Sequence, residues 1–154
     1  MNNGPLPTRL VFLSDLPAQA HGNKVRFLGC VTRYTLSTGV LQLQHAYHHP
    51  PNNPTVAFVD VNVILESLKR EDTQVGAWVN VMGYVEEVLK ERKREGAQEQ
   101  GKTEQMKRKE RSVREGPRAV GVRVKAIMLW SAGGVKIEEY ERTLEEKLSL
   151  ETGP

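Results

Sequence analysis

Residues 24–35 read KVRFLGCVTRYT, a run that is rich in β-branched and aromatic side chains. Apolar and polar residues alternate over part of its length, which predicts a β-strand. Gly29 interrupts the run and predicts a bulge or a sharp bend at that point. A strand that must bend sharply is typical of a small closed barrel, and Gly83 interrupts a later strand in the same way.

The flanking sequence predicts four more strands and two helices. We expect strands over 40–45, 55–61, 76–88 and 118–130. Asn62 is expected to cap a short helix that ends at Leu68, and residues 136–149 are expected to form a terminal helix. Five short strands with a helix between the third and the fourth match the OB-fold, an all-β Greek-key barrel. An open antiparallel sheet with the same elements is the alternative.

The length of 154 residues fits one domain. We expect a flexible N-terminus over 1–9, a single OB-fold domain over 10–149 and a flexible tail over 150–154. Residues 90–115 lie between the fourth and fifth strands and contain only three apolar side chains, so we expect a disordered loop there.

The positive charge of the chain belongs to that loop. The whole sequence has 22 Lys and Arg against 19 Asp and Glu, a net charge of +3. Residues 90–115 contain ten basic and six acidic residues, which leaves twelve basic and thirteen acidic residues elsewhere. Residues 136–151 have the opposite balance, three basic against six acidic. The predicted barrel is therefore close to neutral.

Several function classes lack their sequence signals. No apolar run approaches the ~20 residues of a membrane-spanning helix. Cys30 is the only cysteine, which excludes an intramolecular disulfide and favours a packing role. Neither phosphate-binding glycine motif occurs. His45, His48 and His49 lie in a Pro/Asn-rich stretch, where a solvated loop is favoured over a metal site. We expect no enzyme, no metal and no cofactor.

An OB barrel contacts nucleic acid on its second and third strands and through the loop between the fourth and fifth. That loop is the basic segment here, which predicts contacts to a phosphate backbone or, alternatively, a nuclear-import signal. Phe58 is the only aromatic residue on the two strands, so binding by this domain alone is expected to be weak. The candidate nucleic-acid-binding residues are Arg92, Lys93, Arg94, Lys107, Arg108, Lys109 and Arg111.

The first and fourth strands are apolar on both faces. In the first strand Leu28 and Tyr34 lie opposite the face that carries Phe27, and in the fourth strand Met82 and Tyr84 lie opposite the valines. Such a surface needs a second cover, which either the terminal helix or a partner protein provides. Aromatic and Met enrichment is typical of the centre of a protein interface.

Two runs resemble a known family. Residues 22–29, GNKVRFLG, together with Val31 and Tyr34, resemble the first strand of the smallest subunit of the CST telomere-capping complex, the Ten-one family. Residues 75–85, VGAWVNVMGYV, resemble the fourth strand of that family, most closely its fungal members. The resemblance covers roughly residues 8–89 and 117–149. The family is itself similar to the small subunit of replication protein A.

The resemblance implies a non-catalytic subunit of a nuclear complex at chromosome ends. Such a subunit pairs with the middle OB-fold subunit of CST and, through it, with the large subunit. The complex protects the telomeric single-stranded overhang and assists lagging-strand fill-in. Carried onto this chain, the partner-binding residues are Tyr34, Met82, Tyr84, Ile137, Tyr140, Arg142, Leu144 and Leu148.

Two other functions remain as alternatives. A free-standing single-stranded DNA binder would depend on the basic loop, and its affinity would fall steeply with salt. An RNA-binding or translation-related OB-fold protein would differ chiefly in its substrate.

Overall fold

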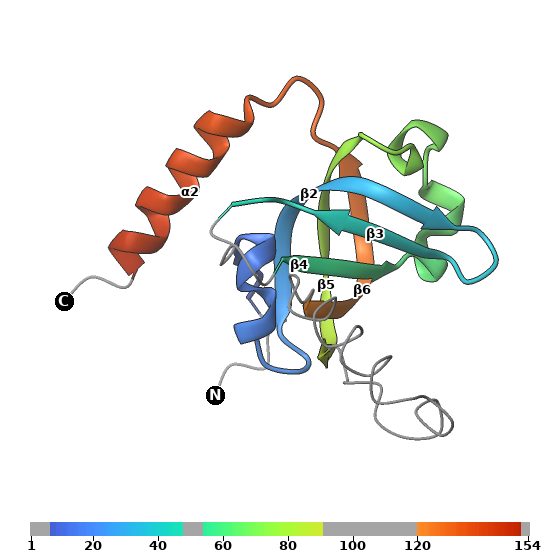
Figure 1. Ribbon diagram of the computed structural model, residues 1–154, viewed down its shortest axis with the longest axis horizontal. Coiled ribbons are helices and arrows are strands. Elements are labelled where there is room, and N and C mark those ends of the chain that lie inside the picture. The colour runs from blue at the N-terminus through green and yellow to red at the C-terminus, as the bar shows by residue number, and fades with distance from the viewer. Residues whose placement is uncertain (1–6, 48–53, 91–119, 152–154) are drawn as a thin grey trace, which may run out of the picture.

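Five long strands form the body of the molecule (Figure 1). The computed structural model describes residues 7–47, 54–90 and 120–151. The strands are β2 (Lys24–Thr35), β3 (Val40–Gln44), β4 (Thr55–Asp60), β5 (Trp78–Lys90) and β6 (Val120–Ser131). Their positions confirm the five predicted strands, with ends that differ by one or two residues.

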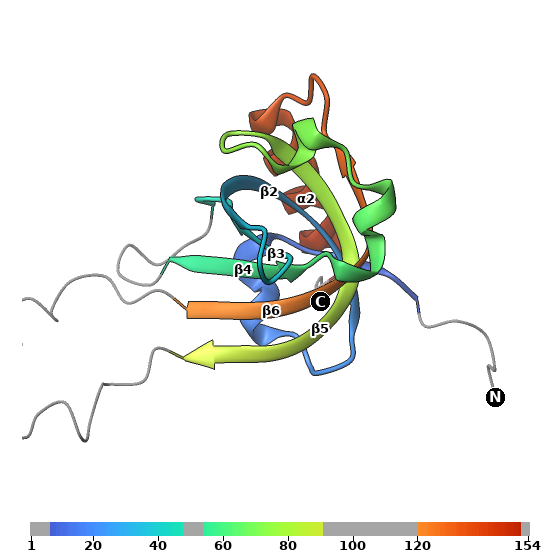
Figure 2. The same ribbon diagram turned by 90° about the vertical axis from the view of Figure 1, so that its right-hand side faces the viewer.

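The strands close into a barrel, because β2 pairs with both β3 and β5. The sheet order is β1-β2-β3-β4-β6-β5, and the additional β2–β5 pairing joins the two ends. The β4–β6 pairing is parallel and the other pairings among the five long strands are antiparallel. This connectivity is that of the OB-fold and excludes the open sheet. Figure 2 shows the strong curvature of β2 and β5 that closure requires.

Shorter elements cover the ends and one side of the barrel. They are β1 (Arg9–Leu10), η1 (Leu13–Ala18), η2 (Asn62–Ser67), η3 (Arg70–Thr73) and the terminal helix α2 (Ile137–Glu151). The sequence patterns did not predict β1 and η1, and η1 packs Leu13 and Leu16 into the core. The predicted cap at Asn62 is wrong, since its amide donates to the backbone oxygen of Thr38 (3.0 Å) and to Asp60 (2.7 Å).

The described strand pairings contain three irregularities in register, which change the faces that side chains occupy. One lies between Val31 and Arg33, and it brings Tyr34 against the core instead of the outer face predicted for it. A second lies between Met82 and Gly83 on β5, opposite Met128 and Ala126 of β6, and a third lies between Val85 and Glu87. The second leaves Met128 54% exposed, although uninterrupted alternation would place it on the same face as the buried Val124 and Ala126.

Glycine is needed at positions 29 and 83 because atoms of a neighbouring strand lie very close to the backbone there. A Cβ at Gly83 would lie 2.2 Å from the Lys125 carbonyl oxygen, which belongs to the neighbouring strand. A Cβ at Gly29 would lie 2.9 Å from Leu43 Cβ. The predicted irregularity at Gly83 is confirmed, whereas the irregularity of β2 lies beyond Gly29. In the part of the chain that the structure describes, no helix is long and apolar enough to cross a membrane.

Candidate partner-binding surface beside the terminal helix

The apolar stripe of α2 faces its own barrel. Leu144 is 2% exposed, and Ile137, Tyr140 and Leu148 are half-buried, whereas Arg142 lies on the exposed face. The helix begins after the Gly133-containing turn that follows β6, and it lies outside the barrel on the side of β2 (Figure 1; Figure 2). The helix therefore covers part of the doubly apolar surface by itself.

An aromatic cluster fills the space between α2 and the barrel. Its members are Phe12, His45, Tyr47, Trp78 and Tyr140. The Phe12 and Tyr47 rings have centroids 4.8 Å apart, and the His45 and Trp78 rings meet edge to face at 5.4 Å. Edge-to-face and tilted pairs at these distances are favourable contacts, so the cluster fixes the helix against the barrel.

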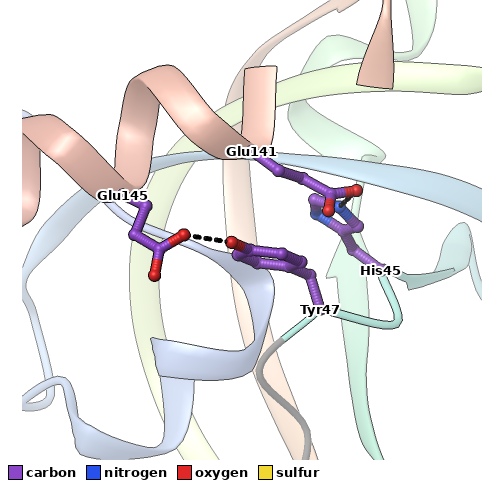
Figure 3. A network of polar contacts seen from close by, with 4 residues as sticks. All are labelled: His45, Tyr47, Glu141 and Glu145. Carbon is purple, nitrogen blue, oxygen red and sulfur yellow. Dashed lines mark hydrogen bonds and ion pairs between the residues drawn. The ribbon is translucent and has the colours of Figure 1, made fainter. Parts of the chain in front are cut away.

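Two polar contacts join the same helix to the end of β3 (Figure 3). His45 Nε2 lies 3.3 Å from Glu141 Oε1, and the Tyr47 hydroxyl donates a hydrogen bond to Glu145. That hydrogen bond raises the pKa of Tyr47 to about 12. The prediction of a solvated loop is wrong for His45, because its side chain is only 3% exposed. His48 and His49 lie outside the described residues.

Burial also shifts the pKa of Tyr140 upward. Desolvation raises it to about 12, against smaller opposing effects of Arg26 and the Leu28 backbone. The Tyr140 hydroxyl is buried and has no hydrogen-bond partner of ordinary geometry among the described residues. A buried ionised phenolate would be costly there, so the hydroxyl stays protonated at neutral pH.

A groove remains open between α2 and β1. Its volume is about 510 Å³, and Leu10, Val135, Tyr140 and Leu144 supply its apolar lining. Lys136 and Lys147 are basic residues on the helix side of the groove. Val135 is 37% exposed and Leu10 is half-buried, so an apolar segment can reach both.

An apolar patch, the Met82 patch, continues from this groove across the outer face of the sheet. It consists of Met82, Tyr84, Met128 and Trp130. Register partners form one continuous row from Leu10 through Arg26 and Met82 to Met128. The Arg26 guanidinium lies 5.0 Å from the Trp130 ring centroid, which is within cation–π range.

Met82 and Tyr84 therefore lie where the sequence placed them, on the outer face. Tyr34 packs against the core instead, away from this surface. Sequence patterns missed Leu10, Met128 and Trp130. Trp130 lies at the end of its predicted strand, and the irregularity beside Met128 reverses the alternation of the residues before it. The basic candidates Arg92 to Arg94 and Lys107 to Arg111 lie outside the described residues.

The described residues offer little for catalysis. No group of three or more His, Cys, Asp or Glu that could hold a metal ion occurs among residues 7–47, 54–90 and 120–151. Cys30 is half-buried, and burial raises the pKa of its thiol, which fits packing better than a nucleophile. The surface just described is suited to binding another protein.

The geometry defines an OB-fold barrel with a terminal helix and a partly exposed apolar face. A family model described as "Telomere capping, CST complex subunit" and named Ten1 matches residues 1–145. The chain therefore belongs to the Ten1 family of telomere-capping CST complex subunits. This confirms the resemblance of the first and fourth strands.

Solved structures show the same fold. The chain is similar to a chain in the crystal structure of the S. pombe Stn1-Ten1 complex (TM-score 0.59, 20% identity, 95% of this chain and 96% of that one). It is also similar to the S. pombe telomere-capping protein Ten1 (TM-score 0.57, 20% identity, 93% of this chain and 99% of that one). A third similar structure is a chain of U. maydis replication protein A bound to single-stranded DNA (TM-score 0.52, 15% identity, 95% of this chain and 94% of that one). No curated protein sequence matches the chain.

Proposed function

We propose that this chain is the small, non-catalytic subunit of a telomere-capping complex and pairs with a second OB-fold subunit through the groove and the Met82 patch. Membership of the Ten1 family supports the capping role. The observation that carries the interface is the row from Leu10 through Arg26 and Met82 to Met128, in which the first three residues are half-buried and Met128 is 54% exposed. Met, aromatic residues and Arg are the types enriched at protein interfaces.

The terminal helix contributes to the pairing through one of two faces. Its apolar stripe, with Ile137, Tyr140, Leu144 and Leu148, packs against the barrel and contributes one wall of the groove. A partner segment in the groove would touch the exposed edge of this stripe. Arg142 lies on the opposite, exposed face of the helix. If a change at Arg142 weakens partner binding, the outer face of the helix takes part in the pairing.

The partner proposed is an Stn1-like OB-fold subunit. The similar chain from S. pombe is described in a complex with Stn1, which supports this choice. An interface of standard size buries about 1,600 Å² in total, more than the groove alone provides. Through that partner the chain would join the large CST subunit, act at chromosome ends in the nucleus, protect single-stranded telomeric DNA and assist lagging-strand fill-in.

Paired charge variants test the interface. The full chain is co-expressed with its second OB-fold subunit, and the Kd is measured by titration calorimetry. We expect Met82→Glu with Met128→Glu to weaken binding at least about 30-fold, because buried charges in an interface centre are left unpaired. The matched control is Val63→Glu with Leu65→Glu, at residues 66% and 47% exposed on η2. A Kd within threefold of the unaltered pair, with both variants folded, would refute the interface.

The basic segment favours a second candidate function. Ten basic residues between positions 90 and 115 would let the chain alone bind single-stranded DNA or RNA. Deleting 91–115 should then remove nearly all affinity and most of the salt dependence. Unchanged binding after that deletion would exclude this function without affecting the pairing proposal.

A further inference from the structure

The segment that leads from β6 into α2 carries a lysine in a short sequence pattern. Residues 135–138 read VKIE, so a large apolar residue precedes the lysine and a glutamate lies two residues after it. The same pattern occurs once more in the sequence, as LKRE in residues 68–71. Enzymes that conjugate small ubiquitin-like modifiers to lysine dock such a pattern through its apolar side chain and its carboxylate, provided that both are accessible.

The two copies of the pattern differ in accessibility. The Lys136 side chain is 77% exposed, Val135 is 37% exposed, and Glu138 lies on the exposed face of the first helical turn. In the other copy Lys69 is exposed, but Leu68 packs against the core. An enzyme can therefore reach the apolar side chain, the lysine and the carboxylate together only in the copy before α2.

The backbone of this copy is not locked into the helix. Val135 and Lys136 precede α2, which begins at Ile137. Two glycines come before them: Gly133 has a φ of 60°, and a Cβ at Gly134 would meet no atom within 4 Å. Figure 1 shows this segment projecting away from the strands. Fraying of the first helical turn is therefore enough to extend the pattern for docking in an enzyme cleft.

The Lys136 amine is held only weakly within the chain. Its Nζ lies 3.9 Å from Glu139 Oε1, and the two side chains are 77% and 61% exposed. An ion pair of this length between exposed side chains contributes little free energy. The amine is therefore available to react.

We propose that Lys136 is a conjugation site for a small ubiquitin-like modifier of the SUMO class. The modifier arrives as a thioester on the cysteine of its conjugating enzyme, and ATP drives the formation of that thioester. The unprotonated Lys136 Nζ attacks the thioester carbonyl carbon, which forms an isopeptide bond and breaks the carbon–sulfur bond. The amine gives up one proton, and the enzyme cysteine leaves as a thiol.

Conjugation at this lysine would also regulate pairing with the second subunit. Val135 and Lys136 line the groove between α2 and β1. A modifier attached there would occupy the space of the partner segment, so conjugation and pairing would exclude each other. This consequence rests on the proposed function, whereas the conjugation site itself does not.

The test is conjugation of the full chain in vitro with a SUMO-class modifier, its activating and conjugating enzymes, and ATP. Gel electrophoresis gives the initial rate, and mass spectrometry identifies the modified lysine. We expect Lys136→Arg, which keeps the charge, to lower the rate at least about tenfold, and Glu138→Gln to lower it less. The matched controls are Lys69→Arg, in the copy with a buried apolar residue, and Glu146→Gln on the exposed face of α2. Both should react as the unaltered chain does.

A rate in Lys136→Arg within about twofold of the unaltered chain would overturn the proposal, as would a modified chain without the modifier on Lys136. The same reaction on the chain paired with its second OB-fold subunit tests the exclusion, and we expect it to be at least about tenfold slower. Equal rates in the free and paired chains would refute the exclusion and the groove as pairing surface, while the conjugation site would stand. The two proposals therefore fail by different measurements.

Discussion

The inner stripe of α2 and the Met82 patch are both apolar surfaces beside β2, yet only the first is covered by the chain itself. Leu144 is 2% exposed beneath the helix, whereas Met128 is 54% exposed on the sheet. The aromatic cluster and the His45–Glu141 contact join the helix to the barrel. In the Met82 patch, Arg26 makes a cation–π contact with Trp130, and Met82, Tyr84 and Trp130 stay half-buried.

The difference shows that an apolar stripe in the sequence predicts a buried surface, but does not indicate whether the same chain or a partner protein buries it. The sequence offered the helix stripe and the sheet residues together as partner contacts. The structure gives the stripe a cover within the chain, so a change there acts first on folding. A change in the Met82 patch should act on binding, and the predictions below use this contrast.

The largest effect is expected at Leu144. Replacing this buried side chain in Leu144→Ala should lower the free energy of unfolding by about 2–5 kcal/mol, through lost burial and the cavity left behind. Urea unfolding followed by circular dichroism measures it. The matched control is Leu150→Ala on the same helix, where the side chain is 84% exposed and little change is expected.

Equal stability of the two leucine variants would contradict the helix packing described above. In that case α2 would not rest on the barrel in solution, and its stripe would be free to contact a partner directly. Hydrogen exchange of the α2 amides in Leu144→Ala separates local release of the helix from global unfolding.

The barrel was predictable because alternating apolar and polar residues mark the strands, and because the order of strands and helices along the chain is that of the OB-fold. The five strands and the terminal helix all lie where the patterns placed them. Of the strand irregularities, the sequence predicted the one beside Gly83 but not the one between Val31 and Arg33. A shift of one residue reverses every later side chain, so the faces beyond an irregularity cannot be assigned until its position is known. Strict alternation therefore misplaces Tyr34, for which it predicted the outer face, and it would misplace Met128 in the same way.

The site was only partly predictable because it is assembled from distant segments. Met82 and Tyr84 could be found from one strand alone. Leu10 and His45 could not, because their roles depend on β1 pairing with β2 and on the helix returning to the end of β3. Single-strand alternation carries no information about such contacts between segments far apart in the sequence.

A smaller effect is expected from the Tyr140 hydroxyl, and it depends on pH. Burial raises the pKa of Tyr140 from its ordinary value of 10 to about 12. Below pH 10 both folded and unfolded chains keep the proton, so the full stability is present. Between pH 10 and 12 the unfolded chain loses its proton first, and stability falls. Allowing for partial exposure of the ring, the loss is about 1–2 kcal/mol.

Tyr140→Phe should remove that loss while leaving stability at pH 7 unchanged or slightly higher, because it deletes a buried hydroxyl that lacks a partner of ordinary geometry. Urea unfolding at pH 7 and pH 11 makes the comparison. An equal loss of stability at pH 11 in the variant would show that this ring is not held against the barrel.

The smallest effect is expected at Tyr47, whose hydroxyl donates to Glu145 on the exposed side of the helix. Tyr47→Phe removes this exposed hydrogen bond but keeps the ring against Phe12, so stability at pH 7 should fall only slightly. The stability of Glu145→Gln, which keeps a hydrogen-bond acceptor, should fall less. A loss as large as that of Leu144→Ala would mean that polar contacts, and not the buried stripe, hold α2 on the barrel. A small loss would leave apolar burial as the main force that keeps this face covered while the Met82 patch stays open.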